Sequence, residues 1–244
     1  MTDSEDDHHF SEGQGFNETY EEFDLDPPEL RVDTDKVDPV DSRVLTDLLD
    51  EHNVNQEAID VESLIDVGLN YMEINRHEQA TTTFERAARF AEEDSLLEQE
   101  AWTNKGVAHA QMEEYDEAIG AYQEALRIAE RSEHAAVAET NLAYALWETG
   151  KTEQALEHAE RAVEIDNRFA QAWYNRGFFL LERGLAEEAV NCFDNAMRLG
   201  LRSADLLEEK ARAHEELGED EQAEDLADEA EELRADAEQQ LVEK

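Results

Sequence analysis

The chain has 244 residues, of which 65 are Asp or Glu and 20 are Lys or Arg, so its formal net charge is -45. This charge argues against direct binding to nucleic-acid phosphates or to an anionic membrane surface, because both would repel it. The single cysteine, Cys192, excludes an intrachain disulfide, and no apolar leader opens the chain. We therefore expect a soluble, cytoplasmic protein.

The acidity extends over the whole chain, with 20 acidic and 3 basic residues in the first sixty positions and 45 against 17 in the rest. Lysine occurs five times and arginine fifteen times. This pattern resembles proteins of extreme halophiles, in which molar salt shortens electrostatic screening to roughly 3 Å. The alternative interpretation is attraction of a basic partner, such as a histone-like or ribosomal protein.

Residues 1–39 combine acidic residues, Gly, Pro and scattered aromatics, which predicts a disordered acidic tail. Its segment FDLDPPEL is a candidate linear motif, with a purely solubilising tail as the alternative. Residues 40–60 are expected to form a capping helix and linker, because DSRVLTDLLDEHN (41–53) offers an N-cap and an apolar face. This helix is expected to cover the exposed edge of the unit that follows; occupying a ligand groove is the alternative.

An internal repeat follows: AWTNKGVAHA (101–110) is echoed seventy-one residues later by AWYNRGFFLL (172–181). A template of about 34 residues finds five copies. The units span 61–94, 99–132, 136–169, 170–203 and 204–237, the fifth being polar and capping, and 238–244 is a C-terminal extension. Four extra residues, SLLE, separate the first two units, and three near Ser132 predict a longer joint between the second and third.

Each unit has the pattern of a helical hairpin, with large apolar residues at spacings of three and four. Between the two helices of a unit lie residues that accept a left-handed backbone, with Glu113 as the exception: Asn75, Gly150, Gly184 and Gly218. One hairpin cannot bury its own apolar face, so the units must stack. The sequence therefore predicts an all-α solenoid.

At these residues the chain resembles the tetratricopeptide repeat family, most closely in QAWYNRGFFLLERGLAEEAVNCFDNAMRLG (171–200). The resemblance covers residues 61–237 and implies a right-handed superhelix whose first helices line a concave peptide-binding groove. Carried over by position, the groove residues are Thr103, Asn104, Val107, Thr140, Asn141, Tyr144, Trp147, Tyr174, Asn175, Phe178 and Leu181. Lys105, Arg176 and Lys210 occupy a leucine-like slot, which predicts that their charged ends extend past the helix edge.

The asparagines of this set can pair with the backbone of an extended peptide, because an amide both donates and accepts hydrogen bonds. The aromatic residues beside them could supply apolar anchor pockets. The alternative is that these are packing residues which the repeat needs in any case. The matching faces lack the lysines and arginines that would clamp an acidic tail, so a receptor for acidic tails is not expected.

No catalytic, cofactor or metal site is predicted. DTDKVDPVD lacks the turn glycine of a calcium loop, and His109, His214 and Cys192 fall at packing positions. The predicted function is a non-catalytic scaffold or adaptor that binds an unidentified protein or peptide. The alternatives are a structural subunit of a larger assembly and an acidic, chaperone-like binder of basic proteins.

Overall fold

The computed structural model describes residues 60–242, and every regular element in that range is an α-helix. The predicted tail (1–39) and the predicted helix at 41–53 lie outside the described residues. The helices are α2 (Val61–Glu73), α3 (His77–Phe90), α4 (Leu96–Gln111), α5 (Tyr115–Ile128), α6 (Glu133–Glu148), α7 (Thr152–Ile165), α8 (Ala170–Glu182), α9 (Ala186–Arg198), α10 (Ala204–Leu217) and α11 (Asp220–Val242).

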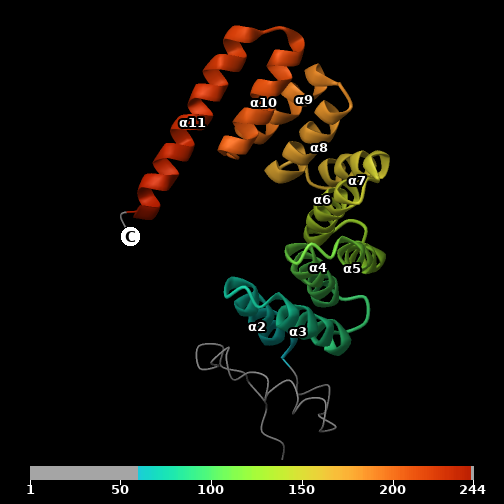
Figure 1. Cartoon of the computed structure of the whole chain (residues 1–244). Helices are drawn as coiled ribbons and strands as arrows, with labels where there is room; N and C mark the ends of the chain where they lie inside the picture. Colours follow the sequence, from blue (N-terminus) through green and yellow to red (C-terminus); the bar gives the residue numbers. More distant parts are fainter. Residues whose placement is uncertain (1–59, 243–244) are drawn as a thin grey trace, which may run out of the picture.

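Consecutive helices pair into five hairpins, and the hairpins stack into an arc (Figure 1). The even-numbered helices also contact one another from hairpin to hairpin, α2 with α4, α4 with α6, α6 with α8 and α8 with α10. They therefore form the inner layer of the arc, where the radius is smallest. This arrangement confirms the predicted all-α solenoid.

Serine side chains cap the start of α4 and of α6, as Ser203 does for α10. Ser95 accepts a hydrogen bond from the Glu98 amide at 3.1 Å, and Ser132 accepts one from the Ala135 amide at 2.9 Å. Both helices are 16 residues long, against 13 for α2 and α8. The extra residues thus add a helical turn to α4 and α6. The predicted longer joint before the third hairpin is wrong, because only residues 129–132 separate α5 from α6.

The turn inside each hairpin requires one residue with a left-handed backbone, and the structure confirms the positions expected from the sequence. Asn75 has φ 57°, and the glycines at 150, 184 and 218 have φ between 74° and 77°. Glu113 takes the same conformation at φ 61° although it has a Cβ atom. The tertiary structure therefore imposes a conformation there that the residue itself disfavours.

Changing Glu113 to Gly is expected to raise the free energy of unfolding by about 1 kcal/mol, because glycine accepts positive φ without a steric cost. The matched control is Gly150→Glu, at the equivalent turn of the next hairpin, where φ is 77°. That change should lower stability by a similar amount. Urea unfolding followed by circular dichroism measures the free energy of unfolding of both variants. A loss of stability in Glu113→Gly would contradict backbone strain at Glu113.

A glycine on each of three inner helices faces an aromatic ring of its partner helix. An added Cβ atom would lie 2.4 Å from the Phe84 ring at Gly68 and 2.4 Å from the Tyr122 ring at Gly106. Gly177 and Phe193 repeat the relation in the fourth hairpin at 2.8 Å. In the third and fifth hairpins alanine replaces both members, at 143 with 159 and at 211 with 227. The glycine and the ring are therefore one packing unit, because an aromatic ring leaves no room for a Cβ atom.

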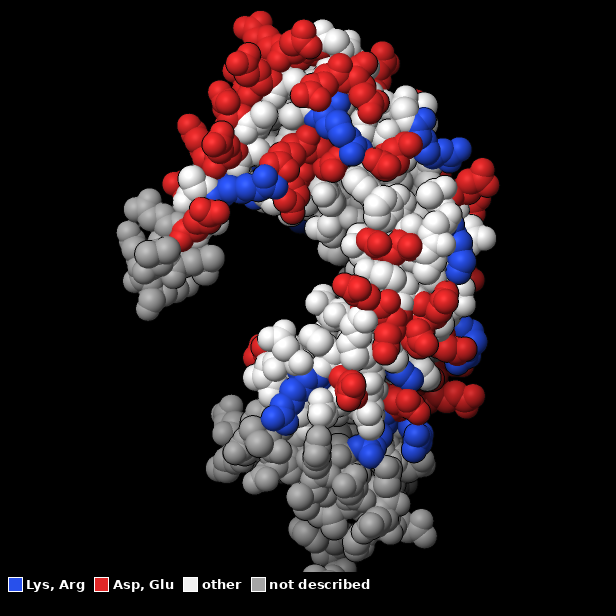
Figure 2. All heavy atoms as spheres, in the orientation of Figure 1, with Lys and Arg blue, Asp and Glu red and all other residues white. Residues whose placement is uncertain are grey.

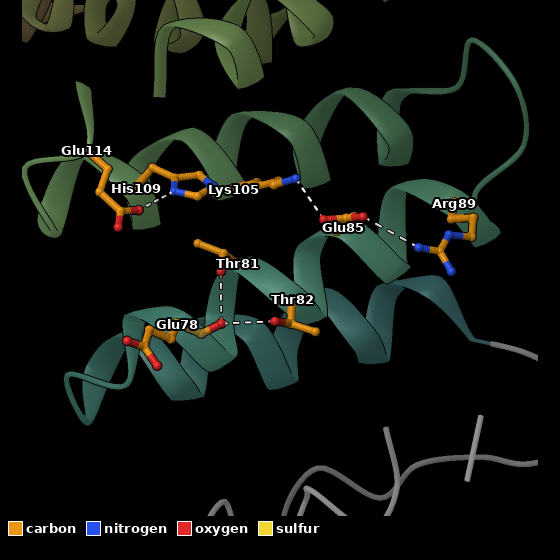
Figure 3. A network of polar contacts seen from close by, with 8 residues as sticks. All are labelled: Glu78, Thr81, Thr82, Glu85, Arg89, Lys105, His109 and Glu114. Carbon is orange, nitrogen blue, oxygen red and sulfur yellow. Dashed lines mark hydrogen bonds and ion pairs between the residues drawn. The ribbon is translucent and has the colours of Figure 1, made fainter. Parts of the chain in front are cut away.

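The basic residues in the leucine-like slot extend their charged ends past the helix edge, as predicted, and the structure shows that these ends reach the preceding hairpin. Lys105 Nζ lies 2.9 Å from Glu85 Oε2 on α3, and Figure 3 shows this pair with Arg89 on the other side of Glu85. Lys210 Nζ lies 2.6 Å from Asp194 on α9, and Arg176 lies 3.5 Å from Glu160 on α7. Each pair crosses the boundary between two hairpins.

A buried glutamine joins α4 to the end of α5. Gln99 is fully buried, and its amide nitrogen donates to the carbonyl oxygens of Ala125 at 2.9 Å and Ala129 at 2.6 Å. Its carbonyl oxygen accepts from the Ser132 hydroxyl at 2.6 Å. Carbonyl groups at a helix end have no partner within the helix, so Gln99 satisfies the end of α5 and fixes the start of α6.

Candidate functional site

The inner face of the arc carries direct contacts between side chains of successive inner helices. Trp147 on α6 meets Phe178 on α8 with ring centroids 5.0 Å apart, edge to face. The guanidinium of Arg212, on α10 and 34 residues beyond Phe178, lies 6.0 Å from the Phe178 ring. These contacts join the inner helices of three successive hairpins, α6, α8 and α10.

Tyr115, Tyr144, Trp147 and Phe178 form a continuous aromatic row across three hairpins. Tyr115 and Tyr144 are 6.4 Å apart between centroids, and Tyr144 and Trp147 are stacked at 6.4 Å. Tyr144 is 44% exposed and the other three are half-buried, so the row presents ring surface to solvent. In Figure 2 uncoloured side chains gather over the middle hairpins in the hollow of the arc, with carboxylates around them.

Four of the predicted groove residues do not reach this surface. Thr103, Thr140, Asn175 and Leu181 are each at most 7% exposed. The hydroxyls of both threonines donate to carbonyl oxygens one turn earlier in their own helices. These four side chains are therefore packing residues, which corrects their assignment to the groove surface.

Asn175 shows why the sequence pattern misled. Its amide nitrogen donates to the Thr140 carbonyl oxygen at 3.3 Å, and its oxygen accepts from Gln171 at 3.0 Å. Both bonding groups of the side chain are used inside the protein, and one bond joins α8 to α6. The residue type fits peptide binding, but in this position it holds two hairpins together.

The remaining predicted residues are half-buried or exposed. Asn104 and Val107 are half-buried on α4, and Asn141 is half-buried on α6. Tyr174 is half-buried and packs on Phe193 at 6.1 Å between centroids. The structure thus brings Tyr144, Trp147 and Phe178 into one surface.

Sequence reasoning missed two members of the site. Tyr115 is the first residue of α5 and lies outside the inner helices from which the groove residues were chosen. Arg212 lies in the polar last hairpin, which was interpreted only as a cap. Its exact offset of 34 residues from Phe178 was the available signal for placing it on the same face.

The tyrosines of this face are surrounded by carboxylates. A hydrogen bond to Glu148 and burial raise the pKa of Tyr144 above the ordinary range of a phenol. Burial, together with the charges of Glu209 and Asp205, raises the pKa of Tyr174 to about 12. The phenols therefore stay protonated at neutral pH and keep their capacity to donate hydrogen bonds.

A second hollow, of about 380 Å³, lies between α5, α6 and α7. Within it the buried Glu139 carboxylate lies 2.5 Å from His158 and 3.9 Å from Arg161. The hollow is also lined by Glu130, Arg131 and Glu164, so side chains of both charges face it and it offers no single ligand charge. It is therefore a weaker candidate than the aromatic row.

The histidines and the cysteine singled out in the sequence have structural partners. His109 lies 2.8 Å from Glu114 at the turn of its hairpin, as Figure 3 shows, and His214 lies 2.6 Å from Glu219 at the equivalent turn. Cys192 is buried in the core, and burial raises the pKa of its thiol to about 11. The prediction of a packing residue is confirmed for Cys192, whereas the two histidines are half-buried and pair with a carboxylate at the turn.

The fold and the inner face define a class of protein, the helical-hairpin solenoids. Family models described as tetratricopeptide repeat match residues 97–168 and 180–238 of the chain. The chain is a tetratricopeptide repeat protein. No protein with a curated description matches it in sequence. Within residues 60–242, none of the helices combines the length and the apolar character needed to cross a bilayer.

Several solved structures share the fold. BtubC (BKLC) from P. vanneervenii has 19% identity and a TM-score of 0.64, covering 82% of this chain and 89% of that one. YrrB, described as a tetratricopeptide repeat protein with an unusual peptide-binding site, has 20% identity and a TM-score of 0.56, covering 78% and 92%. MamA from Desulfovibrio magneticus RS-1 has 16% identity and a TM-score of 0.58, covering 72% and 96%.

Proposed function

We propose that the chain is a non-catalytic scaffold that binds an extended peptide segment of a partner protein along its inner face. One observation carries this proposal: an aromatic row with exposed ring surface crosses three hairpins on the inner face. Half-exposed aromatic rings held rigidly in a line supply anchor contacts at a small cost in side-chain entropy. Tetratricopeptide repeat proteins generally mediate protein–protein interactions and are generally non-catalytic.

The surroundings of the row suit a peptide backbone. Asn104 on α4 and Asn141 on α6 are half-buried on inner helices, and their amides can bond to peptide groups without reading the sequence of the partner. YrrB, which shares the fold, has a described peptide-binding site, and this gives further support. The structural-subunit alternative would place the contacts on the outer face or at the ends of the arc.

The proposal is tested by selecting displayed random peptides on the full chain and measuring the affinity of the selected peptides by fluorescence anisotropy. Trp147→Ala and Phe178→Ala are each expected to weaken binding about 30-fold or more, because anchor residues contribute at least about 2 kcal/mol. Tyr144→Ala removes a ring that is 44% exposed, so it should weaken binding with little effect on stability.

The control is Ile74→Ala, which removes an apolar side chain that is 43% exposed at the turn of the first hairpin, away from the row. It should leave affinity unchanged. Selected peptides that bind Trp147→Ala and Tyr144→Ala as tightly as the parent chain would contradict the proposal. Unchanged thermal unfolding of Tyr144→Ala separates lost contacts from lost folding.

A further inference from the structure

The aromatic row is bordered by carboxylates at both of its ends. Glu148, one turn after Tyr144, hydrogen-bonds to the Tyr144 phenol, and the charges of Glu148 and Glu113 both act on Tyr115. At the other end, Glu182 and Glu209 lie beside Arg212 at 2.6 Å and 3.1 Å. A ligand on the row would therefore meet negative charge at either end.

The basic side chains near this face are already neutralised. Arg212 contacts the two carboxylates just named, and Arg234 on α11 contacts Asp205 at 3.4 Å as well as Glu208. The charges of Asp205, Glu208 and Glu209 raise the pKa of Tyr174, whereas Arg212 only partly offsets them. The field around the tyrosines of the inner face is therefore negative.

The same charges disfavour the chain's own N-terminal region as the occupant. Residues 1–60 hold 20 acidic and 3 basic side chains, and the apolar segment 41–53 holds four acidic residues and one arginine. Placing this segment on a row bordered by Glu113, Glu148, Glu182 and Glu209 would bring like charges together, which costs free energy. The charges of the row therefore favour an occupant of opposite charge, contributed by another protein.

We propose that the aromatic row binds a basic peptide segment with apolar anchor side chains, contributed by a separate protein. The inference rests on the proposed function and specifies the chemistry of the partner. The anchors pack between Tyr144, Trp147 and Phe178. Lysine or arginine side chains flanking them pair with Glu148 at one end and, at the other end, with the excess negative charge of Glu182 and Glu209, which share Arg212. A cation placed over Tyr144 or Trp147 gains a further attraction to the ring face.

Three synthetic peptides with the same Leu and Phe anchors test this, with Lys, Gln or Glu at every position between the anchors. Binding to the full chain is measured by fluorescence anisotropy over a range of salt concentrations. At a salt concentration of about 0.1 M, the Lys peptide is expected to bind at least about tenfold more tightly than the Gln peptide. This difference in affinity should shrink as the salt concentration rises. The Glu peptide should bind most weakly.

A chain with net charge -45 attracts any basic peptide. Variants therefore distinguish specific binding to the row from this general electrostatic attraction. Trp147→Ala should lose most of the affinity for the Lys peptide while keeping the overall charge. Glu148→Gln should reduce the preference for Lys over Gln severalfold. The matched control, Glu157→Gln on α7, removes the same charge from an exposed position outside the inner layer and should leave the preference unchanged.

The possible results distinguish failure of the basic-partner inference from failure of the proposed function. If the Gln or Glu peptide binds as well as the Lys peptide, and binding still depends on Trp147, the basic partner is ruled out while the proposed function stands. If Trp147→Ala binds each of the three peptides as tightly as the parent chain does, both proposals fail. A synthetic peptide of residues 41–53 that displaces the Lys peptide would make the chain's own segment the occupant and overturn the inference.

Discussion

Changing Tyr122 to Ala is expected to lower the free energy of unfolding by about 3 to 5 kcal/mol, the usual cost of deleting a buried aromatic ring. Tyr122 is 1% exposed and fills the space against Gly106, whose Cβ position lies 2.4 Å from the ring. Denaturant unfolding followed by circular dichroism measures the loss. A decrease below about 1 kcal/mol would contradict the close packing.

The packing of Gly106 against Tyr122 predicts that the effect of Gly106→Ala on stability changes sign when Tyr122 is replaced by Ala. In the parent chain Gly106→Ala overpacks the ring and should cost about 1 to 3 kcal/mol before the gain in helix propensity is counted. In the Tyr122→Ala background the space is open, and Gly106→Ala should stabilise the helix by up to about 1 kcal/mol. The control is Gly120→Ala on α5, where an added Cβ atom meets nothing within 4 Å. It should stabilise both backgrounds.

The third hairpin already carries the combination that this double change would create. Alanine stands at 143 and at 159, the positions equivalent to Gly106 and Tyr122. Both alanines are fully buried. The chain thus contains two solutions to one packing problem. An effect of Gly106→Ala of the same size in both backgrounds would show that the two positions are independent.

Changing Gln99 to Ala is expected to lower the free energy of unfolding by about 2 to 4 kcal/mol, because buried carbonyl groups at the end of α5 lose their donors. The carbonyl oxygens of Ala125 and Ala129 lie 2.9 Å and 2.6 Å from the Gln99 amide nitrogen. Hydrogen exchange should accelerate most in the segment that joins α5 to α6. Unfolding in urea gives the total cost.

Two substitutions make this test specific. Gln99→Glu keeps the size of the side chain but removes the donor when ionised, so it should destabilise at least as much as Gln99→Ala. Gln123→Ala, at an exposed position of α5, should change stability by less than about 0.5 kcal/mol. Equal effects of Gln99→Ala and Gln123→Ala would show that the buried amide contributes nothing to the joint.

The sequence by itself determined the repeat, the hairpin turns and the stacking, because each follows from local spacing. Apolar residues at spacings of three and four define a helix face, and residues such as Gly150 mark the turn within about 34 positions. The charged ends of Lys105 and Lys210 were also predictable, since a long basic side chain in an apolar slot must reach the helix edge.

Only the tertiary structure decided which of the inner-helix residues face the hollow. Thr140 and Asn175 belong to the same pattern as Tyr144 and Phe178, yet the first two are buried and the second two form the aromatic row. Exposure on an inner helix depends on how far the next hairpin overlaps it, and that overlap is set by contacts between residues more than thirty positions apart. Spacing within one hairpin does not contain this information.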